Sequence, residues 1–153
     1  MIYIGSDHHG FELKAKINEW LTGRELEFED AGAFEYDSGD DYVDFAIDVA
    51  QKVARAPEAN RGIVLCGSGV GVEIAANKVQ RIRCGLGFEE DQVFASRKDD
   101  NINVLALAAD NTDEFKAIEL VEKFLETEFV RSDRYLRRIE KISRYEKAAA
   151  DHK

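Results

Sequence analysis

A cysteine followed by a glycine-rich loop is the feature of this chain best suited to chemistry. The apolar run at 63–65 predicts a buried strand, which ends at Cys66 and is followed by Gly67, Gly69 and Gly71. Glycine allows a ligand to approach the backbone, and free amide donors before a helix favour anions, including a thiolate. We therefore expect Cys66 to act as a base or nucleophile. The alternative is a small buried residue, which is the commonest role of a reduced cysteine.

A second cluster of reactive side chains, Asp7, His8 and His9, follows a predicted strand at 2–6. Such groups can move protons or bind a metal ion. A metal site would need more ligands, and the remaining histidine of the chain, His152, lies near its end. We therefore predict no metal. The alternative for the cluster is a pair of surface histidines with Asp7 as a helix cap.

Arginine side chains are concentrated on a predicted helix that begins at Ser132 in an otherwise acidic chain. Arg134 and Arg138 lie four residues apart and therefore share a face, whereas Arg137 points elsewhere. Their forked guanidinium donors suit an anion. A solvated basic face is the ordinary explanation for such a run. A functional role requires this face to reach an active site, for instance that of a neighbouring subunit.

The glycine pattern differs from the common nucleotide-binding motifs. A dinucleotide fingerprint has its third glycine one residue later than Gly71, and a P-loop requires Gly-Lys followed by Ser or Thr. An acidic residue, Glu89 or Glu90, does lie at about the distance where a ribose-binding acid is expected. A nucleotide-binding module therefore stays open as an interpretation.

Apolar periodicity predicts strands that alternate with helices along the chain. The predicted strands cover 2–6, 26–31, 63–65, 81–88 and 102–109. The predicted helices cover 11–21, 42–53, a segment from 72, 89–97 and 113–129, with a last helix from 132 whose end frays at 148–153. We predict a single α/β domain over 1–153, a Rossmann-like three-layer sandwich whose five-stranded parallel sheet carries helices on both faces and an extra C-terminal helix. Its ligand site is expected at the carboxyl ends of the strands.

Size, charge and composition limit the possible partners. A chain of 153 residues with 44% hydrophobic content has room for one core. Its net charge of −10 disfavours nucleic acid and anionic membranes. The sequence begins with a predicted strand rather than a signal peptide and has no apolar run of transmembrane length, so we expect a cytoplasmic protein. Cys66 and Cys84 are expected to stay reduced, with Cys84 in the core.

Four segments together resemble the type B ribose-5-phosphate isomerases and their galactose-6-phosphate isomerase relatives. They read Gly-Ser-Asp-His-His-Gly-Phe-Glu-Leu-Lys at 5–14, Gly-Ile-Val-Leu-Cys-Gly-Ser-Gly-Val-Gly at 62–71, Ile-Ala-Ala-Asn-Lys at 74–78 and Asn-Val-Leu-Ala at 103–106. The resemblance covers almost the whole chain, and the cysteine-glycine loop before Ala-Ala-Asn-Lys is its most specific part. It implies a single sugar-phosphate isomerase domain with a Rossmann-like fold.

This resemblance implies an aldose–ketose isomerase that interconverts ribose 5-phosphate and ribulose 5-phosphate without a metal or cofactor. Cys66 would carry a proton between C1 and C2 of the sugar. The assembly implied is a homodimer, or a tetramer built from dimers, with each site shared between two subunits. The other implied site residues are Ser68 with Gly67, Gly69, Val70 and Gly71 for the enediolate, Asp7 and His8 for ring opening or phosphate, Tyr42 in the lining, and Arg134 and Arg138 for phosphate across the dimer.

Three places depart from the family pattern. Asp99 and Asp100 replace a His-Asn pair before the last predicted strand, Asp110 replaces an arginine after it, and Tyr135 replaces a histidine. Each change makes the anion pocket less positive, and at short range a carboxylate opposes a phosphate by roughly a few kcal/mol. Asp100 is then a candidate substrate contact, and Asp99 a candidate ring-opening base unless the enzyme uses the open-chain sugar. Two alternatives follow: an isomerase of another or an unphosphorylated sugar, or a non-catalytic sugar-binding protein.

Overall fold

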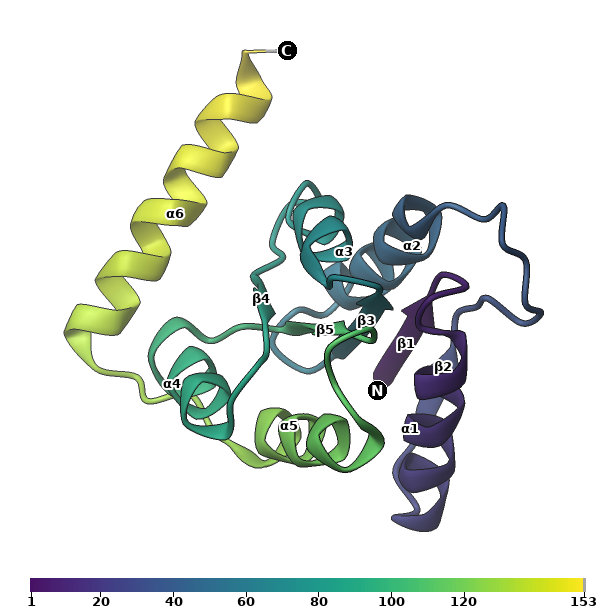
Figure 1. The fold of residues 1–153 in the computed structure, drawn as a ribbon. Coiled ribbons are helices and arrows are strands. Elements are labelled where there is room, and N and C mark those ends of the chain that lie inside the picture. Colours follow the sequence, from purple (N-terminus) through teal and green to yellow (C-terminus); the bar gives the residue numbers. More distant parts are fainter. Residues whose placement is uncertain (153) are drawn as a thin grey trace.

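Five strands form one sheet at the centre of the molecule (Figure 1). The computed structural model describes residues 1–152. The strands are β1 (Ile2–Ser6), β2 (Phe28–Asp30), β3 (Arg61–Cys66), β4 (Cys84–Leu86) and β5 (Val104–Ala108). Their order across the sheet is β2-β1-β3-β5-β4, and every neighbouring pair is parallel. The predicted five-stranded parallel sheet is confirmed.

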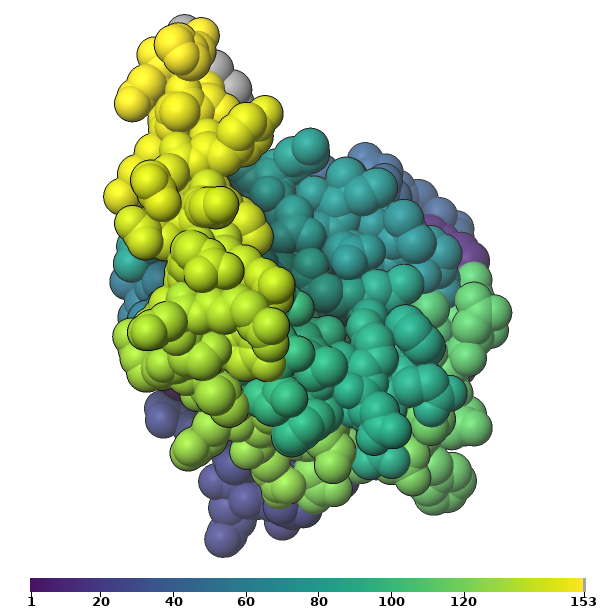
Figure 2. All heavy atoms as spheres, turned by 90° about the vertical axis from the view of Figure 1, so that its left-hand side faces the viewer, coloured from purple at the N-terminus to yellow at the C-terminus, as the bar shows by residue number. Residues whose placement is uncertain are grey.

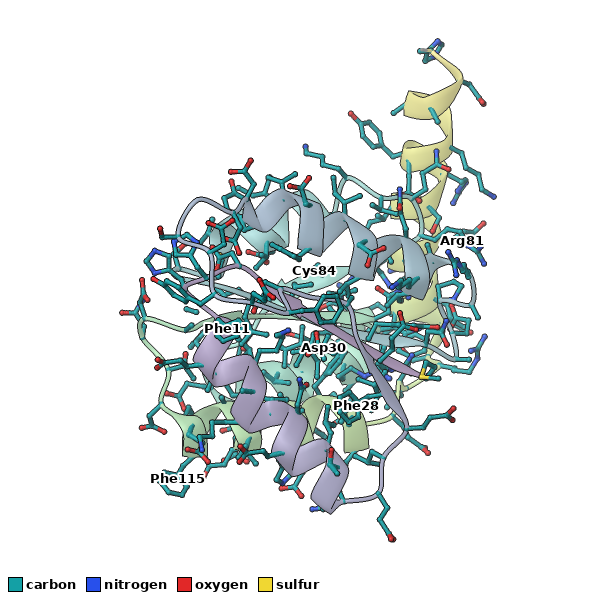
Figure 3. The ribbon with its side chains drawn as sticks, turned by 90° about the vertical axis from the view of Figure 1, so that its right-hand side faces the viewer. Phe11, Phe28, Asp30, Arg81, Cys84 and Phe115 are labelled. Carbon is teal, nitrogen blue, oxygen red and sulfur yellow. The ribbon has the colours of Figure 1, made fainter. Side chains whose placement is uncertain are left out.

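Helices cover both faces of this sheet. In chain order they are α1 (Phe11–Gly23), α2 (Tyr42–Ala54), α3 (Val70–Ala76), α4 (Glu90–Asp100), α5 (Glu114–Glu126) and α6 (Asp133–Asp151). One hydrophobic cluster contains residues of α1, α4 and α5, and a second contains residues of α2 and α3. These two groups of helices lie on opposite sides of the sheet in Figures 1 and 3, so the predicted three layers are confirmed. No helix within residues 1–152 has the length and apolarity needed to cross a membrane.

The central strands divide their side chains between the two hydrophobic clusters. Along β3, Ile63 and Leu65 belong to the cluster shared with α1 and α5, whereas Val64 and Cys66 belong to the one shared with α2 and α3. This alternation is the two-residue period of a strand. Because both faces of the sheet are covered, the strand is a continuous apolar run in the sequence.

The order of the strands opens a crevice at one edge of the sheet. From β1 the chain continues to β2 on one side and then to β3 on the other, and ligands bind where the connections diverge in this way. In the ladder Ser6 pairs with Leu65, and Cys66 pairs with Ala108. The loops that follow β1, β3 and β5 therefore start at the same level and lie side by side.

The last helix, α6, packs outside both hydrophobic clusters. None of its described residues is buried, and it projects beyond the rest of the molecule in Figures 1 and 2. Ser132 caps its start by accepting a hydrogen bond from the Tyr135 amide at 3.3 Å. The helix runs through three alanines to Asp151, and alanine has the highest helix propensity, while the fraying at 148–153 stays a prediction. Position 153 lies outside the described residues.

The edge strands and α5 differ from their predicted extents. β2 and β4 have 3 residues each, shorter than the predicted runs at 26–31 and 81–88, because each pairs on one side only. Phe115 is 78% exposed and points outward in Figure 3. Asp113 caps α5 by accepting a hydrogen bond from the Lys116 amide at 2.9 Å, which leaves Phe115 in the first turn, ahead of the buried stripe.

Candidate active site

The crevice at the carboxyl ends of β1, β3 and β5 contains a cavity of about 490 Å³. Its walls come from the loops after these strands and from the starts of α2 and α3. The lining residues are Asp7, His9, Tyr42, Cys66, Gly67, Ser68, Val70, Gly71, Ile74 and Asp110. The structure thus brings Cys66 and its glycine loop together with Asp7 and Tyr42, which come from other parts of the chain.

Cys66 ends β3 and lines the cavity, although only 4% of the residue is exposed. Its carbonyl accepts a hydrogen bond from the Ala109 amide at 2.9 Å, and the Gly67 carbonyl accepts one from the Asp110 amide at 3.0 Å. These bonds fasten the start of the glycine loop to the segment after β5. The thiol is therefore held by the sheet rather than by a flexible loop.

The glycines of the loop are required by its close packing. Gly69 has a φ of +73°, and a Cβ there would lie 2.6 Å from Leu86 Cδ1 and 2.9 Å from the Leu107 carbonyl carbon. A Cβ on Gly71 would lie 2.6 Å from the Tyr42 ring, so the tyrosine packs directly on the loop. Glycine is the residue that tolerates both the left-handed backbone and such close approach.

Ser68 and Val70 complete the cavity side of this loop. Both residues are exposed, and the Ser68 hydroxyl accepts a hydrogen bond from the Val70 amide at 3.3 Å. The Ser68 hydroxyl keeps its own proton for donation, because accepting a bond does not use it. A negatively charged oxygen in the cavity would find that donor beside Cys66.

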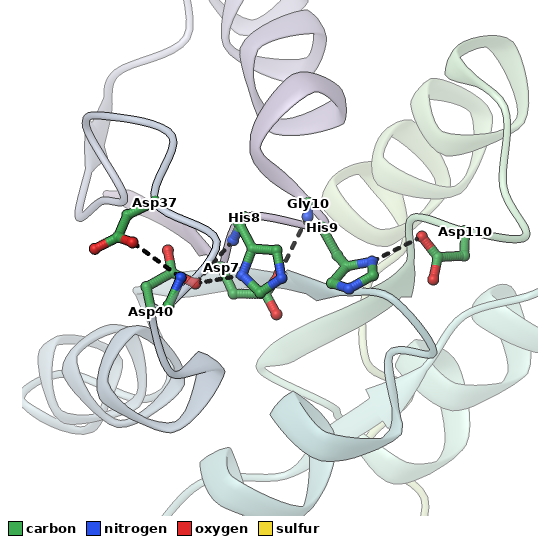
Figure 4. A network of polar contacts seen from close by, with 8 residues as sticks. Asp7, His8, His9, Gly10, Asp37, Asp40 and Asp110 are labelled. Atoms are coloured by element: carbon green, nitrogen blue, oxygen red, sulfur yellow. Dashed lines mark hydrogen bonds and ion pairs between the residues drawn. The ribbon is translucent and has the colours of Figure 1, made fainter.

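His8 is turned toward Asp40 rather than into the cavity (Figure 4). Its Nδ1 lies 2.7 Å from Asp40 Oδ1, and its backbone N–H donates to the same oxygen at 3.0 Å. The hydrogen bond to Asp40 raises the pKa of the His8 imidazole above its usual value. Asp7 is 4% exposed and accepts a hydrogen bond from the Gly10 amide at 3.1 Å, just before α1.

Asp7, His8 and Asp40 form a group whose possible ligand atoms all lie within 4.8 Å of one another. The hydrogen bond between His8 and Asp40 accounts for their proximity. Within residues 1–152 no histidine or cysteine outside this group joins it, so these residues do not carry an argument for a metal ion.

His9 and Asp110 both line the cavity and are in contact with each other. His9 Nδ1 lies 3.2 Å from Asp110 Oδ1, and their side chains are 50% and 54% exposed (Figure 4). The sequence places His9 in the reactive cluster after the first strand and Asp110 among the changes in the anion pocket, but it does not predict that the two are in contact. They are 101 positions apart, and the pairing of β1, β3 and β5 brings them together. No local signal in the sequence connects them.

Comparison with known proteins identifies the family. The Ribose/Galactose Isomerase family matches residues 2–142 of the chain. The chain belongs to this family. Among its curated members, the probable ribose-5-phosphate isomerase B of Mycoplasma genitalium is 42% identical over 146 residues, with 95% of each chain covered. The ribose-5-phosphate isomerase B of Mycolicibacterium paratuberculosis is 37% identical, with 95% of this chain and 91% of the relative covered. The protein is accordingly an aldose–ketose isomerase by family, as predicted.

Solved structures of the ribose/galactose isomerase family share the fold. The crystal structure of ribose-5-phosphate isomerase B from Mycoplasma genitalium with bound ribulose-5-phosphate matches with a TM-score of 0.92, 42% identity and 95% of each chain covered. The isomerase from Thermotoga maritima matches with a TM-score of 0.87 and 40% identity, covering 94% of this chain and 97% of that one. The predicted family is thus confirmed by sequence and by fold.

The remaining residues that the family resemblance placed in the site lie away from Cys66 within one chain. Asp99 and Asp100 are the last residues of α4 and precede the amino end of β5, whereas Cys66 stands at the carboxyl end of the sheet. Asp100 and Arg138 line a separate hollow of about 590 Å³ beneath α6. Arg134 is in the first turn of the same helix. One chain therefore carries two separate groups of the predicted site residues.

The second cysteine belongs to the core, as predicted. Cys84 is 8% exposed, and burial raises the pKa of its thiol above the usual value. Its amide donates to Asn77 Oδ1 at 2.8 Å, and its carbonyl accepts from Asn77 Nδ2 at 2.9 Å. Both cysteines are free in the structure. The two thiols differ in surroundings, because the cavity reaches Cys66 and not Cys84.

Proposed function

We propose that this protein interconverts ribose 5-phosphate and ribulose 5-phosphate, with Cys66 as the base. The observation that carries the proposal is the cavity lined by Cys66 and its glycine loop in a chain 42% identical to an isomerase crystallised with ribulose-5-phosphate. The curated relatives bear the same enzyme name over 95% of this chain. A cavity of about 490 Å³ is also of the size expected for a small-molecule site.

The reaction moves one proton from C2 to C1 and a second from the C2 hydroxyl to the C1 oxygen of the open-chain sugar. The Cys66 thiolate removes the proton from C2 of the aldose, the hydroxyl proton passes from O2 to O1 of the enediolate, and the thiol returns its proton to C1. Negative charge develops on the sugar oxygen during this step, so donors already aimed at that oxygen lower the barrier by about 3 kcal/mol each. The Ser68 hydroxyl and the amides of the loop 67–71 are the donors that the cavity offers.

The phosphate is held by a second copy of the chain in this proposal. Arg134 and Arg138 lie on α6, which has no buried residue of its own, while Cys66 lies at the other end of the sheet. A homodimer in which each α6 reaches its partner's cavity would complete both sites and cover the apolar side chains of that helix. Among these, Ile142 and Tyr145 are 59% and 78% exposed in the single chain.

Substitution of each cysteine in turn tests the base. Cys66→Ala should lower kcat for ribose 5-phosphate by about 10²–10⁴-fold, which is the usual contribution of a general base. Cys84→Ala is the matched control, because it removes the other buried thiol outside the cavity, and it should keep most of the activity. Full turnover by Cys66→Ala would show that the thiol is not the base.

Mixing two inactive variants tests the shared site. Cys66→Ala and Arg138→Ala chains, unfolded and refolded together, should form mixed dimers in which one site is intact. Random pairing makes half of the dimers mixed, so the mixture should regain about a quarter of the wild-type specific activity. If the mixture stays as inactive as its components, the two residues act within one chain.

A different substrate is a second candidate because Asp110 lines the cavity. A carboxylate about 4 Å from a phosphate opposes its binding by roughly 4 kcal/mol at an effective dielectric of 20. Isomerisation of an unphosphorylated sugar, or of one phosphorylated elsewhere, would avoid that cost. Isomerisation rates on a panel of free and phosphorylated pentoses and hexoses separate the candidates. If ribose 5-phosphate is the fastest substrate of the panel, the second candidate is rejected. A sugar that raises the melting temperature without being converted would indicate a binding protein.

A further inference from the structure

The proposed substrate requires a chemical step before isomerisation. In water an aldopentose 5-phosphate exists mainly as a five-membered ring, in which the ring oxygen O4 is bonded to C1. Proton removal from C2 requires the free aldehyde, so the C1–O4 bond must first break. That opening needs one group that takes the proton of the C1 hydroxyl and gives a proton to O4.

His9 and Asp110 form a polar pair in the proposed sugar cavity. Both line the cavity of Cys66, and His9 Nδ1 lies 3.2 Å from Asp110 Oδ1. A Cβ built on Gly67 would lie 3.3 Å from His9 Nδ1 and 2.6 Å from Asp110 Oδ2. The His9 and Asp110 side chains therefore pack against Gly67, the residue that directly follows Cys66.

The hydrogen bond to Asp110 selects one form of the imidazole. When Nδ1 carries the proton that Asp110 accepts, Nε2 has a free lone pair and can take up a second proton. The Asp110 amide donates to the Gly67 carbonyl at 3.0 Å, which fixes the carboxylate's backbone on the loop. His9 is half exposed, so a sugar in the cavity can reach its ring.

The other polar groups of the cavity are less suited to this step. Cys66 is assigned to the C2 proton, and Asp7 is almost fully buried with its Oδ1 bonded to the Gly10 amide. Ser68 has no basic form near neutral pH. His8 is held by Asp40 and does not line the cavity. Imidazole is the side chain that both accepts and donates a proton near neutral pH, unlike the phenol of Tyr42, which also lines the cavity. Asp99, the ring-opening candidate from the sequence, lies near the end of α4 and does not line this cavity, which leaves His9.

We propose that His9, positioned by Asp110, opens the sugar ring. Nε2 of neutral His9 takes the proton of the C1 hydroxyl, the C1–O1 double bond forms, and the C1–O4 bond breaks with its electron pair passing to O4. The imidazolium then gives its proton to O4. The step consumes no proton overall and leaves His9 neutral for the next turnover. This inference rests on the proposed function and adds a catalytic residue to it.

Charged groups from three elements surround His9 and must stay unchanged in the test. Besides Asp110, a hollow beside His9 is lined by Glu12 and Lys16 of α1 and by Glu114 of α5. Asp7 lies two positions before it in the same loop. Substitutions confined to His9 and Asp110 leave the rest of this charge environment intact.

The two directions of the reaction distinguish ring opening from isomerisation. Ribulose 5-phosphate cannot close a five-membered ring, because the hydroxyl needed for closure carries the phosphate. His9→Gln should therefore lower kcat for ribose 5-phosphate by about 10²-fold or more and leave kcat for ribulose 5-phosphate within about threefold of wild type. The exposed histidine at the end of the chain supplies the control His152→Gln, which should change neither value.

Asp110→Asn tests the positioning role with a second variant. It should lower kcat for ribose 5-phosphate, by less than His9→Gln does, and leave kcat for ribulose 5-phosphate nearly unchanged. If Asp110 only repels the phosphate, this variant would instead lower KM and leave kcat unchanged. Added imidazole should restore part of the activity of His9→Gly, because a free base can fill the space of the missing ring.

The outcomes separate this inference from the proposed function. A wild-type chain that converts neither sugar rejects the proposed function itself. An active wild type whose His9→Gln variant loses both directions equally, or loses neither, rejects ring opening by His9. Melting temperatures of all variants should match that of the wild type, since His9 and Asp110 are half exposed and outside both hydrophobic clusters.

Discussion

The packing around Gly69 predicts a large loss of stability for Gly69→Ala. The φ of +73° places the new side chain in the left-handed region, which costs about 1–2 kcal/mol. Its Cβ would also lie 2.6 Å from Leu86 Cδ1, 2.9 Å from the Leu107 carbonyl carbon and 3.0 Å from the Ala108 nitrogen. Two of these atoms belong to the backbone of β5, so the clash adds about 1–3 kcal/mol. We expect the free energy of unfolding to fall by about 2–5 kcal/mol.

Urea unfolding at a fixed protein concentration measures this change, and the midpoint temperature should fall by about 2–4 °C for each kcal/mol. Gly23→Ala is the matched control. Gly23 ends α1, and a Cβ there would meet nothing within 4 Å, so this variant should be as stable as wild type or more stable by up to about 1 kcal/mol. The reasoning would be refuted by a Gly69→Ala protein whose unfolding free energy lies within about 0.5 kcal/mol of wild type.

Three further predictions concern single residues. His8 has a raised pKa because Asp40 binds its protonated ring, so this pair stabilises the fold at acidic pH and the contribution is lost as pH rises through the raised pKa. An NMR titration of Asp40→Asn should show the His8 pKa nearer its ordinary value; an unmoved titration would contradict the assignment. Cys84 should resist iodoacetamide at pH 8 until the protein is unfolded in urea, because burial disfavours its thiolate. Labelling at Cys84 itself in the native protein, located by mass spectrometry, would contradict its placement. Phe124→Ala should cost about 3–5 kcal/mol because the ring is fully buried, while the same change at exposed Phe115 should cost less than about 0.5 kcal/mol, and equal losses would contradict the core assignment.

The fold could be predicted because its signals are local and consistent. The central strands are buried on both faces, so residues 63–65 and 104–107 appear as continuous apolar runs. Their flanking glycines and acidic residues mark where strands end and helices begin. The edge strands carry weaker signals, since residues such as Glu29 and Gly85 sit on strands supported from one side only.

The site was predictable where it is made from one continuous segment. Cys66, Ser68 and the glycines after them are neighbours in sequence, and the strand before them shows which edge of the sheet they occupy. The contacts of His9 with Asp110 and of His8 with Asp40 join positions 101 and 32 apart. Such pairs depend on strand order, and β5 lying beside β3 rather than outside β4 is not evident from local pattern. The same limit applies to α6, which has no buried residue within a single chain.

The shortness of both edge strands has a consequence for behaviour at high concentration. β2 and β4 have 3 residues each, so the outer rims of the sheet offer few free backbone groups to another molecule. Long exposed edges are the usual template for strand-by-strand aggregation, and proteins commonly blunt them. The sheet is thereby protected against fibril-like growth while its long central strands remain fully covered.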